Sequence, residues 1–117
     1  MTVHKINLSK EAAQDIASGT KTLIIESILE NIETSIRVGD IFLIESARVS
    51  VKAIRRYRTL QAMLNNENAK QIYPDATKTE AAQRLKEHFK SEASHHILVY
   101  EIQPLLRLVP KLPAKIK

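Results

Sequence analysis

The sequence of 117 residues contains no cysteine. This absence excludes disulfides, thiolate zinc sites and cysteine nucleophiles. It is consistent with a reducing compartment, and we predict a cytoplasmic protein. No apolar run approaches the ~20 residues that a membrane-spanning helix needs, and no apolar segment follows the first five residues as a secretory signal requires. We therefore expect neither a membrane partner nor secretion.

The motifs of several large enzyme classes are also missing. The sequence has no G-x-x-x-x-G-K-[ST], no G-x-G-x-x-G and no G-x-S-x-G, so nucleotide hydrolysis, Rossmann-type binding and serine hydrolysis have no support. The adjacent His95 and His96 would face opposite sides of a strand, and there is no H-E-x-x-H. We predict no metal site and no cofactor.

Glycine is scarce, which makes Gly19 and Gly39 the predicted positions of turns. Ser9 is a suitable N-cap for a helix over 10–17, and Thr59 for a short helix that buries Leu60, Met63 and Leu64. Hydrophobic periodicity predicts a third helix over 79–90 and strands over 3–8, 21–26, 41–44, 49–57 and 96–102. The stretch 27–34 is ambiguous between a loop and a short helix. This order indicates one α+β domain, built on a small closed or nearly closed sheet.

Charge is distributed unevenly along the chain. Residues 1–47 carry four Lys/Arg against seven Asp/Glu, whereas residues 48–117 carry fourteen against six. A half with a net charge of +8 attracts polyanions, of which nucleic acid is the first candidate. The alternative is a solubilising surface charge. We place a domain at 1–103 and a basic, proline-containing tail at 104–117, which we expect to be disordered from about Pro110.

The segment formed by the predicted fourth strand and the residues on either side of it concentrates cations beside an aromatic ring. Its members are Arg48, Lys52, Arg55, Arg56, Tyr57 and Arg58, called here the arginine arm. Arginine can bind phosphate with two hydrogen bonds, and tyrosine can stack on a base. A regular strand would divide these side chains between two faces unless a bulge intervenes. The arm is therefore a candidate nucleic-acid interface, with a solvated strand edge as the alternative.

Several segments in order resemble the ASCH family of PUA-like domains. Gly19–Lys21 with Thr22 is similar to the family's G-x-K-T segment, and Val38–Asp40 opens the next strand as in that family. Residues 54–64 resemble its strand-to-helix junction, and a proline-containing linker, a helix and a closing strand near Ile102 complete the match. The resemblance implies a small PUA-like β-barrel of about five to six strands with about three helices.

The resemblance also implies a cleft lysine at Lys21 and a role for nearby residues. The family typically continues with E-x-R, or with T-x-R in one bacterial enzyme branch, but here these positions are Ile24 and Glu26. A cleft built around that arginine would lose a cation and gain an anion. The predicted RNA-binding residues are Lys21, Thr22, Glu26, Arg48, Lys52, Arg55, Arg56, Tyr57 and Arg58.

Three functions follow as hypotheses. The first is an RNA-binding module with a basic cleft. The second, implied by the resemblance, is a nucleoside amidohydrolase of the acetylcytidine type, with Lys21 as its lysine, Ile24 in place of its threonine and Glu67 as the nearest candidate glutamate. The third is a protein-interaction domain of a transcription or translation assembly, in which the basic surface meets an acidic partner.

Overall fold

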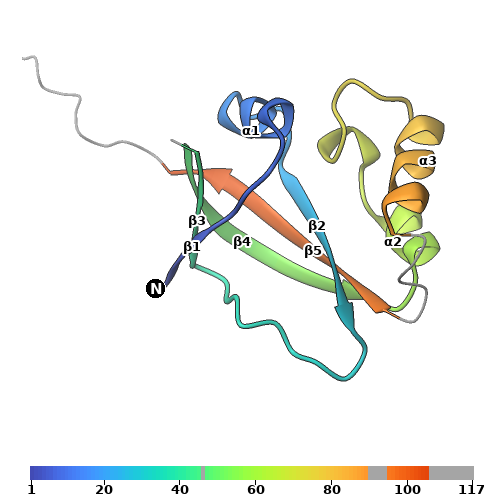
Figure 1. Cartoon of the computed structure of the whole chain (residues 1–117), viewed down its shortest axis with the longest axis horizontal. Helices are drawn as coiled ribbons and strands as arrows, with labels where there is room; N and C mark the ends of the chain where they lie inside the picture. Colours follow the sequence, from blue (N-terminus) through green and yellow to red (C-terminus); the bar gives the residue numbers. More distant parts are fainter. Residues whose placement is uncertain (46, 90–94, 106–117) are drawn as a thin grey trace, which may run out of the picture.

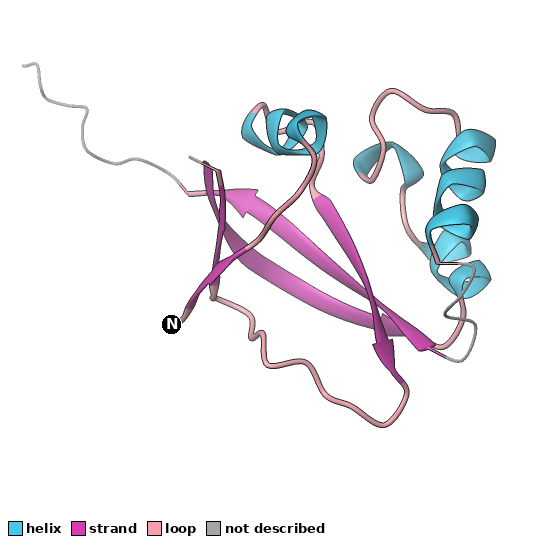
Figure 2. Cartoon of the chain, viewed as in Figure 1, coloured by secondary structure: helices cyan, strands magenta, loops and turns pink. Residues whose placement is uncertain are grey.

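A five-stranded mixed sheet forms the centre of the molecule, with helices on both of its faces (Figures 1 and 2). The computed structural model describes residues 1–45, 47–89 and 95–105. Its elements are β1 (Val3–Lys5), α1 (Lys10–Ala17), β2 (Leu23–Leu29), β3 (Ile41–Ile44), β4 (Ala47–Tyr57), α2 (Leu60–Asn66), the 3₁₀ helix η1 (Ala69–Gln71), α3 (Lys78–His88) and β5 (His95–Pro104). The strand order is β1-β3-β4-β5-β2. The sheet is curled into a half-barrel, which confirms the α+β fold and the small PUA-like barrel.

The pairing is antiparallel except between β1 and β3, which run parallel. The long strand β4 contains a bulge, since Val51 pairs with Ile102 and Ala53 pairs with Glu101. Lys52 is the extra residue. The bulge shifts the alternation of side chains, and it therefore decides which face each residue of the arginine arm occupies.

Two hydrophobic clusters lie on opposite faces of the sheet. The first joins α1 to the face of the sheet that α1 covers, called here the inner face, through residues such as Ile16, Phe42 and Tyr100. The Phe42 and Tyr100 rings meet edge to face with their centroids 5.5 Å apart. The second joins α2, η1 and α3 to the other face. It includes Met63 and Leu85. Because α1 and the other helices pack on different clusters, a space between α1 and the η1–α3 segment is left near the start of β2.

Local signals in the sequence account for most element boundaries. The Ser9 and Thr59 hydroxyls accept hydrogen bonds from the backbone of Ala12 and Ala62, as expected of N-caps. Gly19 and Gly39 have φ of +85° and +95°, the left-handed region that glycine adopts at low cost. These predictions are confirmed.

Several element boundaries differ from the predictions, and three of them illustrate how. α3 begins at Lys78 rather than Thr79, because Thr77 and Glu80 form a reciprocal capping box. β1 ends at Lys5, after which Ile6 and Leu8 turn inward against the first cluster. The first three residues of the ambiguous stretch extend β2 to Leu29.

The end of the tail lies outside the described residues, so the predicted disorder beyond Pro110 stays a prediction. β5 runs one residue past the predicted domain boundary, to Pro104. None of the helices in the described ranges is long and apolar enough to cross a membrane.

Candidate functional site

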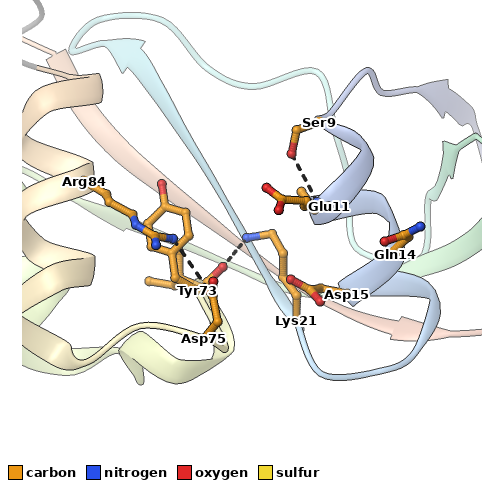
Figure 3. A pocket seen from close by; sticks show the side chains of 10 residues that line it. Ser9, Glu11, Gln14, Asp15, Lys21, Tyr73, Asp75 and Arg84 are labelled. Atoms are coloured by element: carbon orange, nitrogen blue, oxygen red, sulfur yellow. Dashed lines mark hydrogen bonds and ion pairs between the residues drawn. The ribbon is translucent and has the colours of Figure 1, made fainter.

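A cleft lies between α1 and the segment that joins η1 to α3, and Lys21 is at its floor. It consists of a polar cavity of about 470 Å³ and an adjoining, more apolar cavity of about 500 Å³. Both cavities are lined by Ser9, Ala12, Lys21, Ile72 and Tyr73. We call the two together the Lys21 cleft. Figure 3 shows the polar cavity, with the Lys21 amino group between α1 and Tyr73.

Backbone hydrogen bonds fix the position of Lys21. The turn at Gly19 ends α1, and the amides of Thr20 and Lys21 both donate to the Asp15 carbonyl at 3.0 Å. The Lys21 Nζ donates to the carbonyl of Ile72 at 2.7 Å. Only 9% of the residue is exposed. The start of β2 is thus joined to η1 from 51 residues further along the chain.

Burial changes the chemistry of this lysine. It lowers the pKa of Lys21 to about 8, although the Asp15 carboxylate nearby raises the pKa in part. Among the described residues, Lys21 forms no ion pair within 4 Å. A substantial fraction of the side chain is therefore neutral near pH 8, and a neutral amine is a base and a nucleophile.

The wall opposite α1 carries an aromatic ring between two cations. The Tyr73 ring centroid lies 5.5 Å from Lys21 Nζ and 5.1 Å from Arg84 Cζ. Arg84 also forms a 3.6 Å ion pair with Asp75 (Figure 3). Burial raises the pKa of Tyr73, which remains a neutral phenol at physiological pH. Tyr73 and Arg84 together offer a surface on which a planar group can stack.

Known structures with the same architecture were found, although no family model and no curated protein matches the sequence. The hypothetical protein PH0355 superposes with a TM-score of 0.73 and 24% identity over 90% of this chain and all of that one. An ASCH domain from Lactobacillus crispatus gives a TM-score of 0.66 with 10% identity over 88% of this chain and 79% of that one. A mutant of an ASCH protein from Zymomonas mobilis gives 0.64 with 14% identity over 87% and 68%. The chain has the ASCH-domain fold. The suggested resemblance is confirmed at the level of the fold.

Within this ASCH fold, the residues that replace the family's usual pair lie in different places. Ile24 lines the apolar part of the Lys21 cleft. Glu26 is not among the residues that line either cavity of this cleft, and its Oε1 accepts a hydrogen bond from the Tyr100 hydroxyl at 2.5 Å. Tyr100 belongs to the first hydrophobic cluster. Lys21 and Glu26 therefore do not share one cleft.

The arginine arm is divided between the two faces of the ASCH sheet. Arg55 donates to both oxygens of Glu67 at 2.6 and 2.9 Å and to Glu101 at 2.8 Å. The Tyr57 hydroxyl donates to Glu67 on the same face. Arg56 lies on the other face, where it donates to His96 Nδ1. It also donates to three backbone carbonyls at and just beyond the end of β2, those of Leu29, Glu30 and Ile32.

The other predicted residues are likewise not gathered at the cleft. Lys52 lies 3.6 Å from Glu101, whereas Arg48 and Arg58 are exposed. Thr22 directly follows Lys21, and its amide donates to the Gln71 carbonyl. The structure thus brings Lys21 to the cleft and leaves the arginine arm outside it. The contribution of the arm to RNA binding stays a prediction.

Sequence reasoning missed most of the cleft. Its carboxylates are Glu11 and Asp15 from α1 and Asp75 from the segment before α3. The Tyr-Pro-Asp sequence at 73–75 was a usable signal, because it places an aromatic and an acid at a turn before a helix. Glu67, the glutamate suggested for amide hydrolysis, lies outside the lining and is held by Arg55 and Tyr57. In the part of the chain that the structure describes, no group of three or more His, Asp or Glu side chains could hold a metal ion.

The lowered pKa of Lys21 gives a prediction about alkaline stability. Between about pH 8 and 10.5 the unfolded chain retains the lysine proton and the folded chain does not, so this residue makes the folded state more stable as pH rises. We expect the difference in unfolding free energy between wild type and Lys21→Met to grow by about 2 kcal/mol from pH 7 to pH 9.5. Urea unfolding of both proteins at pH 7 and pH 9.5 measures this difference. The same difference in unfolding free energy at the two pH values would contradict the lowered pKa.

Proposed function

We propose that this chain is an RNA-binding module that takes one unpaired base into the Lys21 cleft and keeps the phosphates outside. The observation that carries the proposal is the Tyr73–Arg84 surface beside the buried Lys21 amine. Unpaired RNA bases are commonly bound by stacking on aromatic rings or guanidinium planes. The volume of about 470 Å³ lies within the range of about 300–1,000 Å³ that is usual for small-molecule sites.

The charges of the cleft favour a neutral base over a phosphate. Glu11, Asp15 and Asp75 line the polar cavity, against the cations Lys21 and Arg84. A phosphate placed inside would meet three carboxylates, which repel it. A base is neutral, has apolar faces, and carries hydrogen-bond donors and acceptors on its edge. Ser9 and Gln14 add further polar atoms that such an edge can contact.

Cations suited to the phosphates lie on the elements that form the walls. Lys10 is the first residue of α1, Lys70 lies in η1 and Lys78 begins α3, and all three are exposed. Arg84 is half exposed at the cleft itself. The whole chain has a net charge of +5. These residues support sequence-independent attraction of an RNA backbone around a base held in the cleft.

We expect single-stranded RNA to bind and the matching duplex to bind much more weakly, because paired bases cannot enter the cleft. If about four phosphates are neutralised, the logarithm of the affinity should fall against the logarithm of salt concentration with a slope of about −3. Fluorescence anisotropy with a labelled ten-nucleotide strand, between 50 and 200 mM salt, measures both quantities. Free nucleosides should compete with the strand.

Inorganic polyphosphate is the matched control, because it carries the charge without any base. Equal binding of polyphosphate and single-stranded RNA, with no competition by nucleosides, would overturn the base-binding proposal. No binding at low salt would overturn RNA binding altogether and favour an acidic protein partner.

A nucleoside amidohydrolase has less support from the same geometry. The Lys21 amine, with its pKa of about 8, suits a catalytic base. However, Ile24 supplies no hydroxyl, and Glu67 is engaged elsewhere. Conversion of acetylcytidine to cytidine by the wild type, and not by Lys21→Ala, would reinstate this function.

A further inference from the structure

Lys21 combines accessibility to a cavity with the loss of its usual solvation. Among the described residues, its Nζ donates one hydrogen bond, to the Ile72 carbonyl, and no carboxylate forms an ion pair with it. The residue is 9% exposed, yet it lines both cavities of the cleft. An ammonium in this position has lost most of its water and is not compensated by an ion pair.

This environment increases the fraction of the Lys21 side chain that is a neutral, reactive amine. With a pKa of about 8, roughly a quarter of Lys21 is neutral at pH 7.5, against about 0.1% for an ordinary lysine. The chain contains eleven lysines, and Lys21 is the only buried one in the described ranges. One lysine is therefore set apart from the others by burial, by position in a cavity and by protonation.

We propose that Lys21 is a covalent capture site for small, uncharged aldehydes or ketones with a planar body. The lone pair of Nζ adds to the carbonyl carbon, so that a C–N bond forms and the carbonyl π bond breaks, and one proton passes from the nitrogen to the oxygen. The second nitrogen proton leaves with that hydroxyl as water in the next step. The resulting carbinolamine loses water, and an imine remains. No oxidant or reductant is needed for these steps, and they go beyond the proposed RNA-binding function without depending on it.

The surroundings of the amine define which carbonyl compounds fit. The charged and titratable groups around it are Glu11 and Asp15 from α1, Tyr73 and Asp75 from the segment before α3, and Arg84 and His88 from α3. Carboxylates exceed permanent cations in this set, so anionic carbonyl compounds are disfavoured. Beside the amine, the apolar cavity is lined by Ile24, Leu85 and Phe89, which suit an aromatic or aliphatic body.

Reductive trapping tests the proposal on the whole chain. The protein is incubated with benzaldehyde and cyanoborohydride, which reduces an imine to a stable amine, and the modified lysines are located by peptide mass mapping. We expect Lys21 to be modified about tenfold faster than the exposed Lys10 and Lys70 at pH 7.5. Its rate should rise with pH to a plateau above about pH 8, whereas theirs should keep rising. Glyoxylate, an anionic aldehyde, should show no such preference for Lys21.

Two variants test whether the cleft itself directs the reaction. Ala12 lines both cavities, so Ala12→Met should fill the cleft and slow modification of Lys21 at least fivefold. Ala17→Met lies at the exposed end of the same helix and should leave the rate unchanged. Circular dichroism establishes that both variants are folded.

A Lys21 rate equal to those of Lys10 and Lys70, or one unaffected by Ala12→Met, would overturn the capture site. The RNA proposal is judged separately by adding single-stranded RNA to the trapping reaction. If Lys21 reacts selectively but RNA gives no protection, the capture site stands and the base-binding proposal fails. If RNA binds but Lys21 is not selective, the reverse holds.

Discussion

Replacing Glu67 by alanine is expected to destabilise the domain by about 2–3 kcal/mol. The Glu67 side chain is 5% exposed and accepts two hydrogen bonds from Arg55 and one from Tyr57. Burial pushes the pKa of Glu67 up, but the hydrogen bonds from Arg55 and Tyr57 outweigh burial and lower it. Removal of the carboxylate leaves the Tyr57 hydroxyl and part of the Arg55 guanidinium without their acceptor. Glu101 still accepts from Arg55, which limits the loss.

Urea unfolding at pH 7 measures this effect against two controls. Glu67→Gln keeps the shape of the side chain and one acceptor oxygen, so its loss should be about half as large. Glu33→Ala changes an exposed glutamate and should cost less than about 0.5 kcal/mol. A loss this small for Glu67→Ala would show that the Arg55–Glu67 pair contributes little, and that Arg55 is free to meet a phosphate.

The Arg55–Glu67 pair illustrates why some features were predicted from the sequence and others were not. Caps at Ser9 and Thr59 and turns at Gly19 and Gly39 were predicted because their causes lie within a few neighbouring residues. The arginine arm was also found as a strand. Its cations were predicted to be available for RNA because the sequence does not reveal their partners. Glu67 and Glu101, which pair with Arg55, lie 12 and 46 residues from it along the chain.

The candidate site depended still more on distant contacts. Lys21 was identified from its place after a helix and a glycine turn, but the carbonyl that accepts its hydrogen bond is 51 residues away. The bulge at Lys52 is set by pairing with β5 and leaves no clear mark in the sequence. Tyr73, Asp75 and Arg84 reach the cleft only through the packing of η1 and α3. Local periodicity reveals elements, whereas the chemistry of this cleft arises between elements.

The two departures from the family pattern, Ile24 and Glu26, therefore affect different parts of the structure. Glu26 is held on the inner face by Tyr100, so an acid there does not bring a negative charge into the Lys21 cleft. Ile24 does line the cleft and makes part of it apolar. Together these positions leave a site whose polar contacts come from Lys21, from α1, from the segment before α3 and from Arg84 of α3. The proposed recognition of a base then depends on Tyr73 more than on the strand that follows Lys21.

Replacing Tyr73 by alanine is expected to weaken binding of single-stranded RNA by about 10- to 100-fold, since stacking of a base on an aromatic side chain contributes about 1–3 kcal/mol. The substitution removes the ring that lies between Lys21 and Arg84. It should leave the salt dependence nearly unchanged, because no cation is lost. Tyr73→Phe retains the ring and should bind within about twofold of wild type. Anisotropy titrations at two salt concentrations measure both quantities.

Variants of the arginine arm decide between the cleft and the interface that the sequence suggested. Tyr57→Phe keeps the ring, which packs against the second cluster, and removes only a hydroxyl that already donates to Glu67. Its RNA affinity should match wild type. Arg55→Met, measured where the variant is folded, should weaken binding less than threefold, because two carboxylates already neutralise that guanidinium. A tenfold loss in Arg55→Met with none in Tyr73→Ala would move the interface to the arm, since the phosphates would then be displacing Glu67 and Glu101.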